Sequence, residues 1–155
     1  GGGCARRAGA AGALVSTARG GPAQNTSPAL NWSDAPTGTK SCAVTIYDPD
    51  APTGSGWWHW IIYNIPANTT SLAAGAGNGR NAPSGSAEGP TDFGSKGYGG
   101  PCPPVGDKPH HYNITVFALK VDKLDIPRNA TSAFVGFNLN GNKLATARMT
   151  GLYGR

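Results

Sequence analysis

Two short motifs place histidines and aspartates beside aromatic side chains. The segment DPDAPTGSGWWHW carries Asp48 and Asp50 ahead of His59, and three tryptophans stand next to that histidine. The other two histidines, His110 and His111, open the segment HHYNITVFAL. An imidazole changes its charge near neutral pH, and a neighbouring carboxylate fixes its tautomer and favours the cation. Such residues are suited to holding an anion or to acid–base chemistry.

Each of these signals also has an ordinary structural explanation. A histidine inside an apolar strand is more often a hydrogen-bonded core residue than a ligand. Asp48 and Asp50 flank Pro49 as turn residues commonly do. The glycines of GYGGPCPPVG, residues 97–106, are not followed by Lys-Ser or Lys-Thr, so they do not form the phosphate loop of nucleotide-binding proteins. Only the combination of motifs can therefore indicate a function.

Alternating apolar residues predict the strands that position these side chains. We expect strands over residues 41–48, 57–65, 111–119 and 143–154. The segment 57–65 is apolar on both faces, which is typical of a central strand. Strict alternation would place His59 on one face and both Trp58 and Trp60 on the other. A short helix is predicted near residues 127–139, with Asn129 or Thr131 as its N-cap.

Composition favours one β-rich domain. The chain has 155 residues with 24 glycines, 13 prolines and only 14% charged residues, which indicates short strands joined by many turns. We expect residues 1–24 to be a poorly determined N-terminal segment and residues 25–155 to form a single domain. No run of 18 apolar residues is present, so no membrane span is predicted. The net charge of +5 comes from scattered residues and does not predict nucleic-acid binding.

The cysteines and the N-terminus bear on the compartment. Cys4, Cys42 and Cys102 do not have metal-ligand spacing, and reduced thiols are favoured over one bridge between Cys42 and Cys102. The N-terminal segment has no apolar core of the kind an intact signal peptide needs. A cytoplasmic location is the expectation, or a periplasmic or secreted one if an N-terminal signal has been removed.

Taken together and in order, the motifs resemble the phosphatidylethanolamine-binding protein family, also called the Raf kinase inhibitor protein family. The match is closest to the bacterial and archaeal branch of the family. It is carried by DPDAP, by GPCPPVG with the His-X-Tyr pair that follows, and by the terminal GLYGR. The resemblance implies a mainly β fold, a sandwich of two antiparallel sheets with a few short helices and a small pocket at one end.

The resemblance also implies which residues bind a ligand. Cys102 stands where the family has a glycine, which puts the size of the pocket in doubt. The family's first strand is not recognisable in residues 1–21. No catalytic residue, metal ligand or cofactor is implied. The ligand-binding positions are Asp48, Asp50, Pro52, Trp57, His59, Gly100, Pro103, Pro104, His110, Tyr112 and Tyr153.

The function implied is non-enzymatic binding of a phosphate-bearing small molecule or a phospholipid head group, with a regulatory role. One alternative is an inhibitor of a kinase or protease that acts through its surface. A less favoured one is a hydrolase in which His59, His110 and an acidic residue hold a metal or act as acid and base. A homodimer is also expected, because an uncovered sheet edge invites pairing with another chain.

Overall fold

The alternating segments form strands that pair antiparallel into two sheets. The computed structural model describes residues 6–8, 14–19, 26–100, 106 and 108–153. Within them, a six-stranded sheet has the order β1-β9-β8-β4-β5-β7, and a three-stranded sheet has the order β2-β3-β6. This confirms the predicted mainly β architecture. The strands are β1 (Arg6–Ala8), β2 (Val15–Arg19), β3 (Ala29–Ser33), β4 (Ser41–Asp48), β5 (Trp57–Pro66), β6 (Ser71–Leu72), β7 (Ala87–Glu88), β8 (His110–Leu119) and β9 (Lys143–Tyr153).

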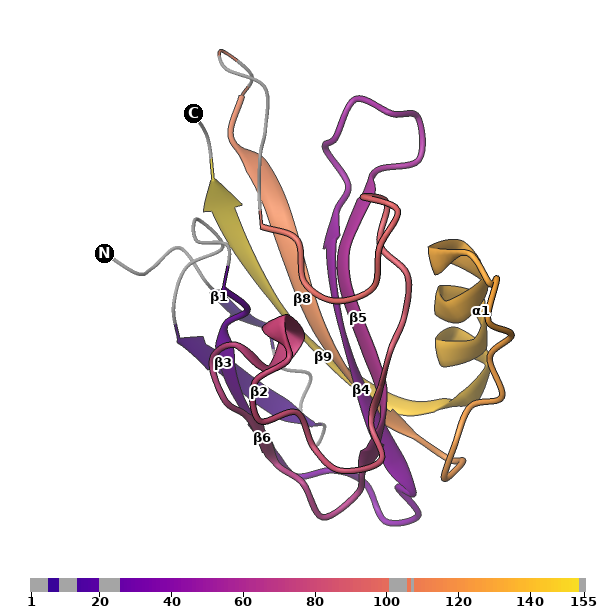
Figure 1. The fold of residues 1–155 in the computed structure, drawn as a ribbon. Helices are drawn as coiled ribbons and strands as arrows, with labels where there is room; N and C mark the ends of the chain where they lie inside the picture. Colours follow the sequence, from indigo (N-terminus) through magenta and orange to yellow (C-terminus); the bar gives the residue numbers. More distant parts are fainter. Residues whose placement is uncertain (1–5, 9–13, 20–25, 101–105, 107, 154–155) are drawn as a thin grey trace.

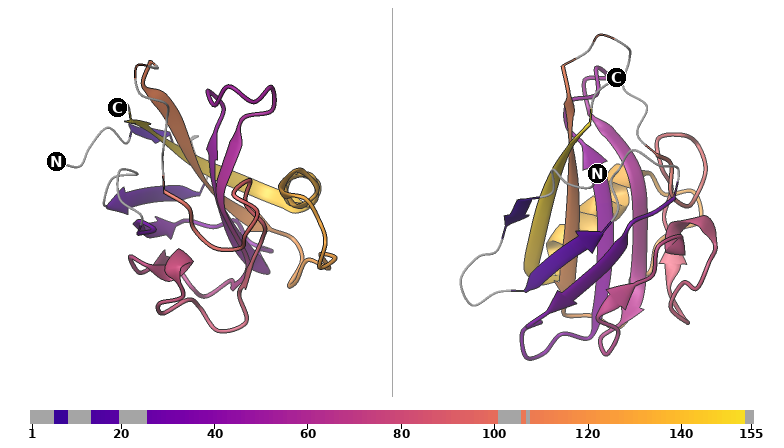
Figure 2. Two further views of the ribbon diagram at one scale, coloured as in Figure 1. Left: turned by 45° about the horizontal axis from the view of Figure 1, so that its top comes forward. Right: turned by 90° about the vertical axis from the view of Figure 1, so that its left-hand side faces the viewer.

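The two sheets face each other, and the helix α1 (Ser132–Asn142) covers the other face of the larger sheet (Figures 1 and 2). A short 3-10 turn, η1 (Ala76–Asn78), lies in the long connection between β6 and β7. No helix in the described part of the chain is long and apolar enough to cross a membrane. The protein is thus a sandwich with one helix packed on its outside.

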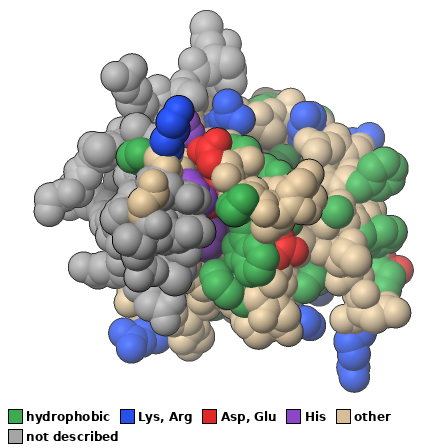
Figure 3. Space-filling view, turned by 90° about the horizontal axis from the view of Figure 1, so that it is seen from above, with side chains coloured by type: hydrophobic (Ala, Val, Ile, Leu, Met, Phe, Trp, Pro, Cys, Tyr) green, Lys and Arg blue, Asp and Glu red, His purple; other side chains and the backbone are tan. Residues whose placement is uncertain are grey.

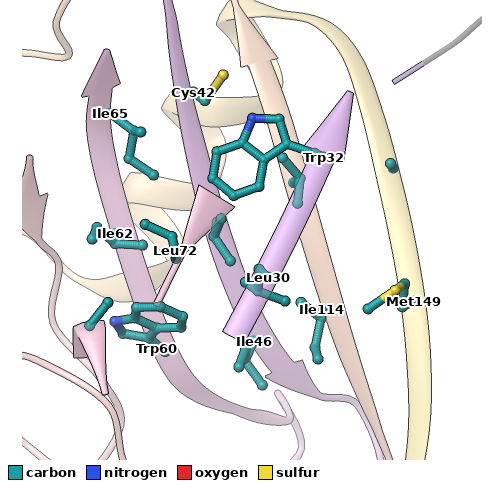
Figure 4. Close-up of a cluster of buried hydrophobic side chains, with 14 of the residues drawn as sticks. Leu30, Trp32, Cys42, Ile46, Trp60, Ile62, Ile65, Leu72, Ile114 and Met149 are labelled. Atoms are coloured by element: carbon teal, nitrogen blue, oxygen red, sulfur yellow. The ribbon is translucent and has the colours of Figure 1, made fainter. Parts of the chain in front are cut away.

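The inter-sheet core is the cluster of apolar side chains between the two sheets (Figure 4). Alternation decides most of its membership, because every second residue of a regular strand points to the same face. Ile65 joins the cluster through a register shift between β4 and β5. Burying each large side chain in such a core stabilises the fold by about 1.5–3 kcal/mol. Its members include Leu30 and Trp32 from β3, Cys42, Val44 and Ile46 from β4, Trp60, Ile62 and Ile65 from β5, and Ile114 and Val116 from β8.

A second cluster lies between the larger sheet and α1. Thr131 is the N-cap of the helix, and its Oγ1 accepts a hydrogen bond from the backbone N–H of Phe134 at 3.0 Å. Gly136 lies against the Trp58 ring, and an added Cβ there would sit only 3.3 Å from that ring. The helix is therefore held on the sheet by close packing and by the predicted cap. We call this group the helix-side cluster: Ala43, Ile61, Tyr63, Phe117, Leu119, Leu124, Val135 and Leu139.

Two strands, β1 and β2, lie in the N-terminal segment, whose sequence has only a weak strand pattern. β1 pairs with β9 at the edge of the larger sheet, and β2 pairs with β3 in the smaller sheet. Glycine and alanine dominate this segment, so its register comes from the partner strands rather than from its own apolar pattern. Leu14, just before β2, is fully buried in the inter-sheet core.

Cys42 is a free thiol buried in the inter-sheet core. Burial raises the pKa of this thiol, and a hydrogen bond with Trp32 opposes that shift. A buried thiol with a raised pKa is unreactive. Cys102, its suggested partner, lies outside the described residues.

Candidate functional site

Three neighbouring strands meet at the end of the larger sheet that carries the predicted ligand residues. In the order β8-β4-β5, Asp48 ends β4 opposite Trp57, the first residue of β5, and His110 is the first residue of β8. Figure 3 looks down on this end of the molecule, where histidine and acidic side chains lie next to hydrophobic ones. Residues far apart in the sequence are thus brought together because their strands are neighbours.

Asp48 and His110 form a buried ion pair if the imidazole is protonated. Their atoms Oδ2 and Nδ1 are 2.7 Å apart, and the two residues are only 2% and 4% exposed. A carboxylate accepts hydrogen bonds, so this contact places a proton on Nδ1 of His110. The other oxygen of Asp48 accepts the backbone N–H of Asp50 at 2.8 Å. Asp48 therefore fixes the His110 tautomer while its own carboxylate is fixed by the following turn.

His59 is held by a backbone carbonyl instead. Its Nδ1 lies 2.7 Å from the carbonyl oxygen of Gly99, which can only accept, so Nδ1 again carries the proton. Burial lowers the pKa of His59, and the carbonyl of Gly99 and the negative charge of Asp48 oppose this shift without cancelling it. The ring is therefore mostly neutral at pH 7 and takes up a proton at a lower pH than an ordinary histidine does.

Aromatic rings surround His59. Its ring centroid is 5.2 Å from that of Tyr112 and 5.5 Å from that of Phe93, both in tilted or edge-on contacts. Trp57 in turn lies edge-on to Phe93 at 5.3 Å. A Cβ at Gly99 would collide with the Phe93 ring, so glycine is needed where the chain supplies its carbonyl to His59. We call Asp48, His59, His110 and Tyr112 the histidine cluster.

A β-bulge corrects the predicted facing of the tryptophans. Ile46 pairs with Trp60, but the next residue of β4, Tyr47, pairs with Trp58, so His59 is the extra residue of β5. A bulge of this kind breaks the alternation of side chains. Trp58 and Trp60 consequently do not share a face. Trp58 packs on the helix-side cluster, whereas Trp60 is buried in the inter-sheet core.

Alternation predicted that His59 and Trp60 lie on opposite faces of the sheet. The bulge shows that this prediction was wrong as well. The His59 ring contacts Tyr112, which belongs to the same inter-sheet core as Trp60. Both side chains therefore point between the two sheets, with His59 nearer the end of the strand. The extra residue is what turns an imidazole toward the Asp48–His110 pair.

Asp50 and Pro52, two of the predicted ligand residues, lie in the turn after β4 and outside the histidine cluster. Asp50 is 40% exposed in its side chain and contacts His111, accepting from the backbone N–H and from Nδ1 at 2.6 Å each. The pKa of Asp50 is lowered, chiefly by that backbone N–H. Pro52 is exposed in the turn after β4. Asp50 thus ties the turn to β8, and neither residue belongs to the histidine cluster.

The remaining predicted positions are placed only in part. Gly100 follows Gly99, and its backbone also contributes to the His59 environment. The backbone of Tyr153 pairs with His110 in the β8–β9 ladder. Pro103 and Pro104 lie outside the described residues, as does Cys102.

Sequence reasoning missed three residues of the loop before Gly100. Asp92 accepts the backbone N–H of Trp58 through Oδ2 at 2.7 Å and so fastens this loop to the bulged part of β5. Phe93 and Gly99 make the contacts to His59 described above. All three belong to the run TDFGSKGYGG, but neither spacing nor residue type shows which strand the run will touch.

A metal site formed from side chains is not found in the described ranges. Within residues 6–8, 14–19, 26–100, 106 and 108–153, no group of three or more His, Cys, Asp and Glu side chains is placed to hold a metal ion.

Comparison with known proteins agrees with the fold and the motifs. The sequence model of the family described as phosphatidylethanolamine-binding protein matches residues 6–154, nearly the whole chain. The chain belongs to the phosphatidylethanolamine-binding protein family. Membership supports a binding protein and does not indicate catalytic activity.

Several relatives are closely similar. The UPF0098 protein YbcL of Escherichia coli K12 is 57% identical over 131 residues, which cover 83% of this chain and 72% of YbcL. YbhB of the same organism is 50% identical over 130 residues, which cover 83% and 82% of the two chains. A protein of Mycobacterium tuberculosis H37Rv named putative lipoprotein LppC is 35% identical over 129 residues, covering 83% of this chain and 60% of LppC.

Solved structures give the same result. The crystal structure of E. coli YbcL matches with a TM-score of 0.82 at 56% identity, covering 84% of this chain and 81% of YbcL. A phosphatidylethanolamine-binding protein homologue from Chlamydia trachomatis D/UW-3/CX matches with a TM-score of 0.70 at 33% identity, covering 84% and 82%.

Proposed function

We propose that the protein is a non-enzymatic binding protein that holds a phosphate-bearing small molecule or a phospholipid head group at the histidine cluster, with a regulatory consequence. The observation that carries the proposal is the buried Asp48–His110 pair beside the ring of His59. At acidic pH, where the ring is protonated, His59 supplies positive charge and a directional N–H donor at Nε2, which an anion such as phosphate requires.

Asp48 has a supporting role in this proposal. Both of its oxygens already accept hydrogen bonds, one from His110 and one from the backbone of Asp50. A carboxylate used in this way orients an imidazole, as a support of a binding residue does. The aromatic rings of Trp57 and Phe93 provide an apolar wall beside the charged groups, which suits a ligand with a polar end and a carbon skeleton.

Membership of the family supports the choice of ligand class. The family is named for phosphatidylethanolamine, whose head group carries a phosphate and an ammonium. We extend this class of ligand to the present chain. One relative is named a lipoprotein, so location outside the cytoplasm has a precedent among the relatives. A homodimer and a kinase or protease partner remain predictions of the sequence.

A ligand screen by thermal unfolding tests the proposal. We expect inorganic phosphate or phosphoethanolamine to raise the melting temperature with the logarithm of its concentration, as binding to the native state requires. Acetate serves as a control for nonspecific anion effects. The His110→Ala variant should lose the response. A phosphate response that is unchanged in both His110→Ala and His59→Ala would place the anion elsewhere and refute the proposal.

A further inference from the structure

The outer side of α1 is apolar, although it faces away from the protein. The helix buries Ser132, Val135, Gly136 and Leu139 against the sheet. At 100° per residue, the opposite face is centred on positions 134, 137 and 141. Phe134 is 44% exposed and Phe137 is 77% exposed. No described element covers this side in the views of Figures 1 and 2.

This face also lacks the charges that normally mark the solvent side of a surface helix. The sequence SAFVGFNLNGN contains no Asp, Glu, Lys or Arg. The amides of Asn138 and Asn142 donate to carbonyls of their own helix, those of Phe134 and Asn138, at 2.9 Å each. These two amides are thus hydrogen-bonded within the helix. Because the helix carries no charged side chain, contact with an apolar medium would not desolvate a charge.

Basic residues border the apolar face at the C-terminal end of the helix. Exposed Lys143 follows α1 directly, at the start of β9. Lys120 is joined to the same end of the helix by its backbone N–H, which donates to the carbonyl of Asn142. From Lys120 to Lys143 the chain has four basic residues (120, 123, 128 and 143) and two acidic ones (122 and 125), a net charge of +2.

We propose that this surface docks on an anionic lipid bilayer, with Phe134 and Phe137 entering the head-group region and the lysines contacting lipid phosphates. Exposed aromatic side chains beside basic ones are the pattern of helices that lie in the membrane interface. The charge of the surface is complementary to anionic lipids.

A second copy of the chain fits this surface less well. An 11-residue helix is about 16 Å long and about 10 Å wide, so one face offers far less than the roughly 800 Å² per partner of a stable interface. Two-fold pairing would also bring two positively charged surroundings together. A bilayer needs no matching surface of fixed size, since shallow insertion of a few side chains is sufficient.

The proposal does not rest on ligand binding at the histidine cluster. That cluster lies at the ends of β4, β5 and β8, whereas the apolar surface lies on the outer side of α1. A soluble anion at the cluster and a membrane at the helix are separate binding events that can be measured separately.

Co-sedimentation with vesicles tests the inference. We expect the protein to bind vesicles of phosphatidylcholine with phosphatidylglycerol, and to bind pure phosphatidylcholine at least several-fold more weakly. Phe137→Ser combined with Phe134→Ser should lower the affinity for the mixed vesicles by about tenfold or more. Lys120→Glu combined with Lys143→Glu should lower it several-fold, and added salt should weaken wild-type binding.

Two variants serve as controls. Lys108→Glu, a lysine-to-glutamate change two residues before His110, should bind vesicles as wild type does. Phe93→Ser, which removes a phenylalanine of nearly the same exposure, 46%, is the control for the histidine cluster: loss of vesicle binding in this variant, with wild-type binding in the Phe134/Phe137 variant, would assign the lipid to that cluster. Circular dichroism should show that all variants are folded.

Three results would overturn the proposal. The first is wild-type binding in the Phe134/Phe137 variant. The second is loss of binding in Phe93→Ser instead, which would assign the lipid to the histidine cluster. The third is sedimentation showing a dimer that Phe137→Ser dissociates, without vesicle binding, which would assign the surface to a second copy.

Discussion

The site depends, at the level of single residues, on the partners of two imidazole rings. Asp48 holds Nδ1 of His110 and the Gly99 carbonyl holds Nδ1 of His59, each at 2.7 Å. The partners differ in charge: a carboxylate holds the His110 ring, whereas an uncharged carbonyl holds the ring of His59, whose pKa is lowered by burial.

Replacing His59 by two different amides separates its two nitrogens. In His59→Asn the amide nitrogen can take the place of Nδ1 and keep the bond to Gly99, so the free energy of unfolding should change by no more than about 1 kcal/mol. The group equivalent to Nε2 is lost, and phosphate affinity should fall about tenfold or more. Calorimetric titration and urea unfolding measure the two effects.

His59→Gln is the matched control for that variant. Its amide can reach the place of Nε2 but leaves the buried Gly99 carbonyl without a donor, which should cost about 1–3 kcal/mol. Phosphate affinity should be reduced less than in His59→Asn. If His59→Asn binds phosphate like the wild type, Nε2 of His59 does not contact the anion.

Anion affinity should depend on pH in a direction set by His59. Burial lowers the pKa of His59, so the ring becomes a cation at a more acidic pH than an ordinary histidine does. Sulfate, whose charge is constant in this range, should bind about tenfold more tightly at pH 5 than at pH 8. Titration calorimetry at several pH values measures this. A flat profile would mean that backbone N–H groups hold the anion.

The bulge in β5 is the element-level feature that forms the site. It adds one residue to the strand between Trp58 and Trp60, so that His59 points between the sheets. The loop that follows β7 is fastened at this place by Asp92, which has two hydrogen bonds with Trp58: its Oδ2 accepts the backbone N–H, and its own backbone N–H donates to the Trp58 carbonyl. The same loop delivers Gly99 to His59.

Asp92→Ala should therefore lower phosphate affinity, although Asp92 does not belong to the histidine cluster. Loss of the carboxylate leaves the Trp58 N–H without its acceptor, and the cost to stability should be about 1–2 kcal/mol. Phosphate affinity should fall as well, because the Gly99 carbonyl is held less firmly. Thermal unfolding and titration measure both. Asp92→Asn keeps an acceptor oxygen and should behave nearly as the wild type; equal losses in both variants would instead show that the charge of Asp92 matters.

Local patterns predicted the elements whose own residues determine them. Strand β4 has the bounds that alternation predicted, and Thr131 caps α1 as expected. Elements held by distant partners were not predicted: β1 and β2 have weak patterns, and the bulge at His59 depends on the register with β4. In the site, the DPD and histidine motifs were visible, but Phe93 and Asp92 lie in a loop whose path is set by tertiary contacts.

For the whole molecule, Trp60 links three parts of the fold. It is fully buried in the inter-sheet core, lies on the central part of the larger sheet and donates its indole N–H to Glu88 Oε2 on the edge strand β7 at 2.7 Å. Burial raises the pKa of Glu88, and the indole N–H opposes this shift by stabilising the carboxylate. The stability of the sandwich is therefore coupled to the ionisation of one edge residue.

Trp60→Phe should destabilise the fold more at neutral than at acidic pH. The smaller ring leaves a gap and removes the N–H, with an expected cost of about 2–3 kcal/mol at pH 7. Without the N–H the pKa of Glu88 rises further, so the carboxylate costs more stability where it is ionised. That extra cost disappears as the pH falls through the pKa of Glu88 and the group takes up a proton.

Urea unfolding of both proteins at pH 7 and pH 4 measures the difference, since every other titratable group is shared. In a Glu88→Gln background the effect of Trp60→Phe should be the same at both pH values. An effect that is independent of pH with Glu88 in place would mean that packing alone accounts for it.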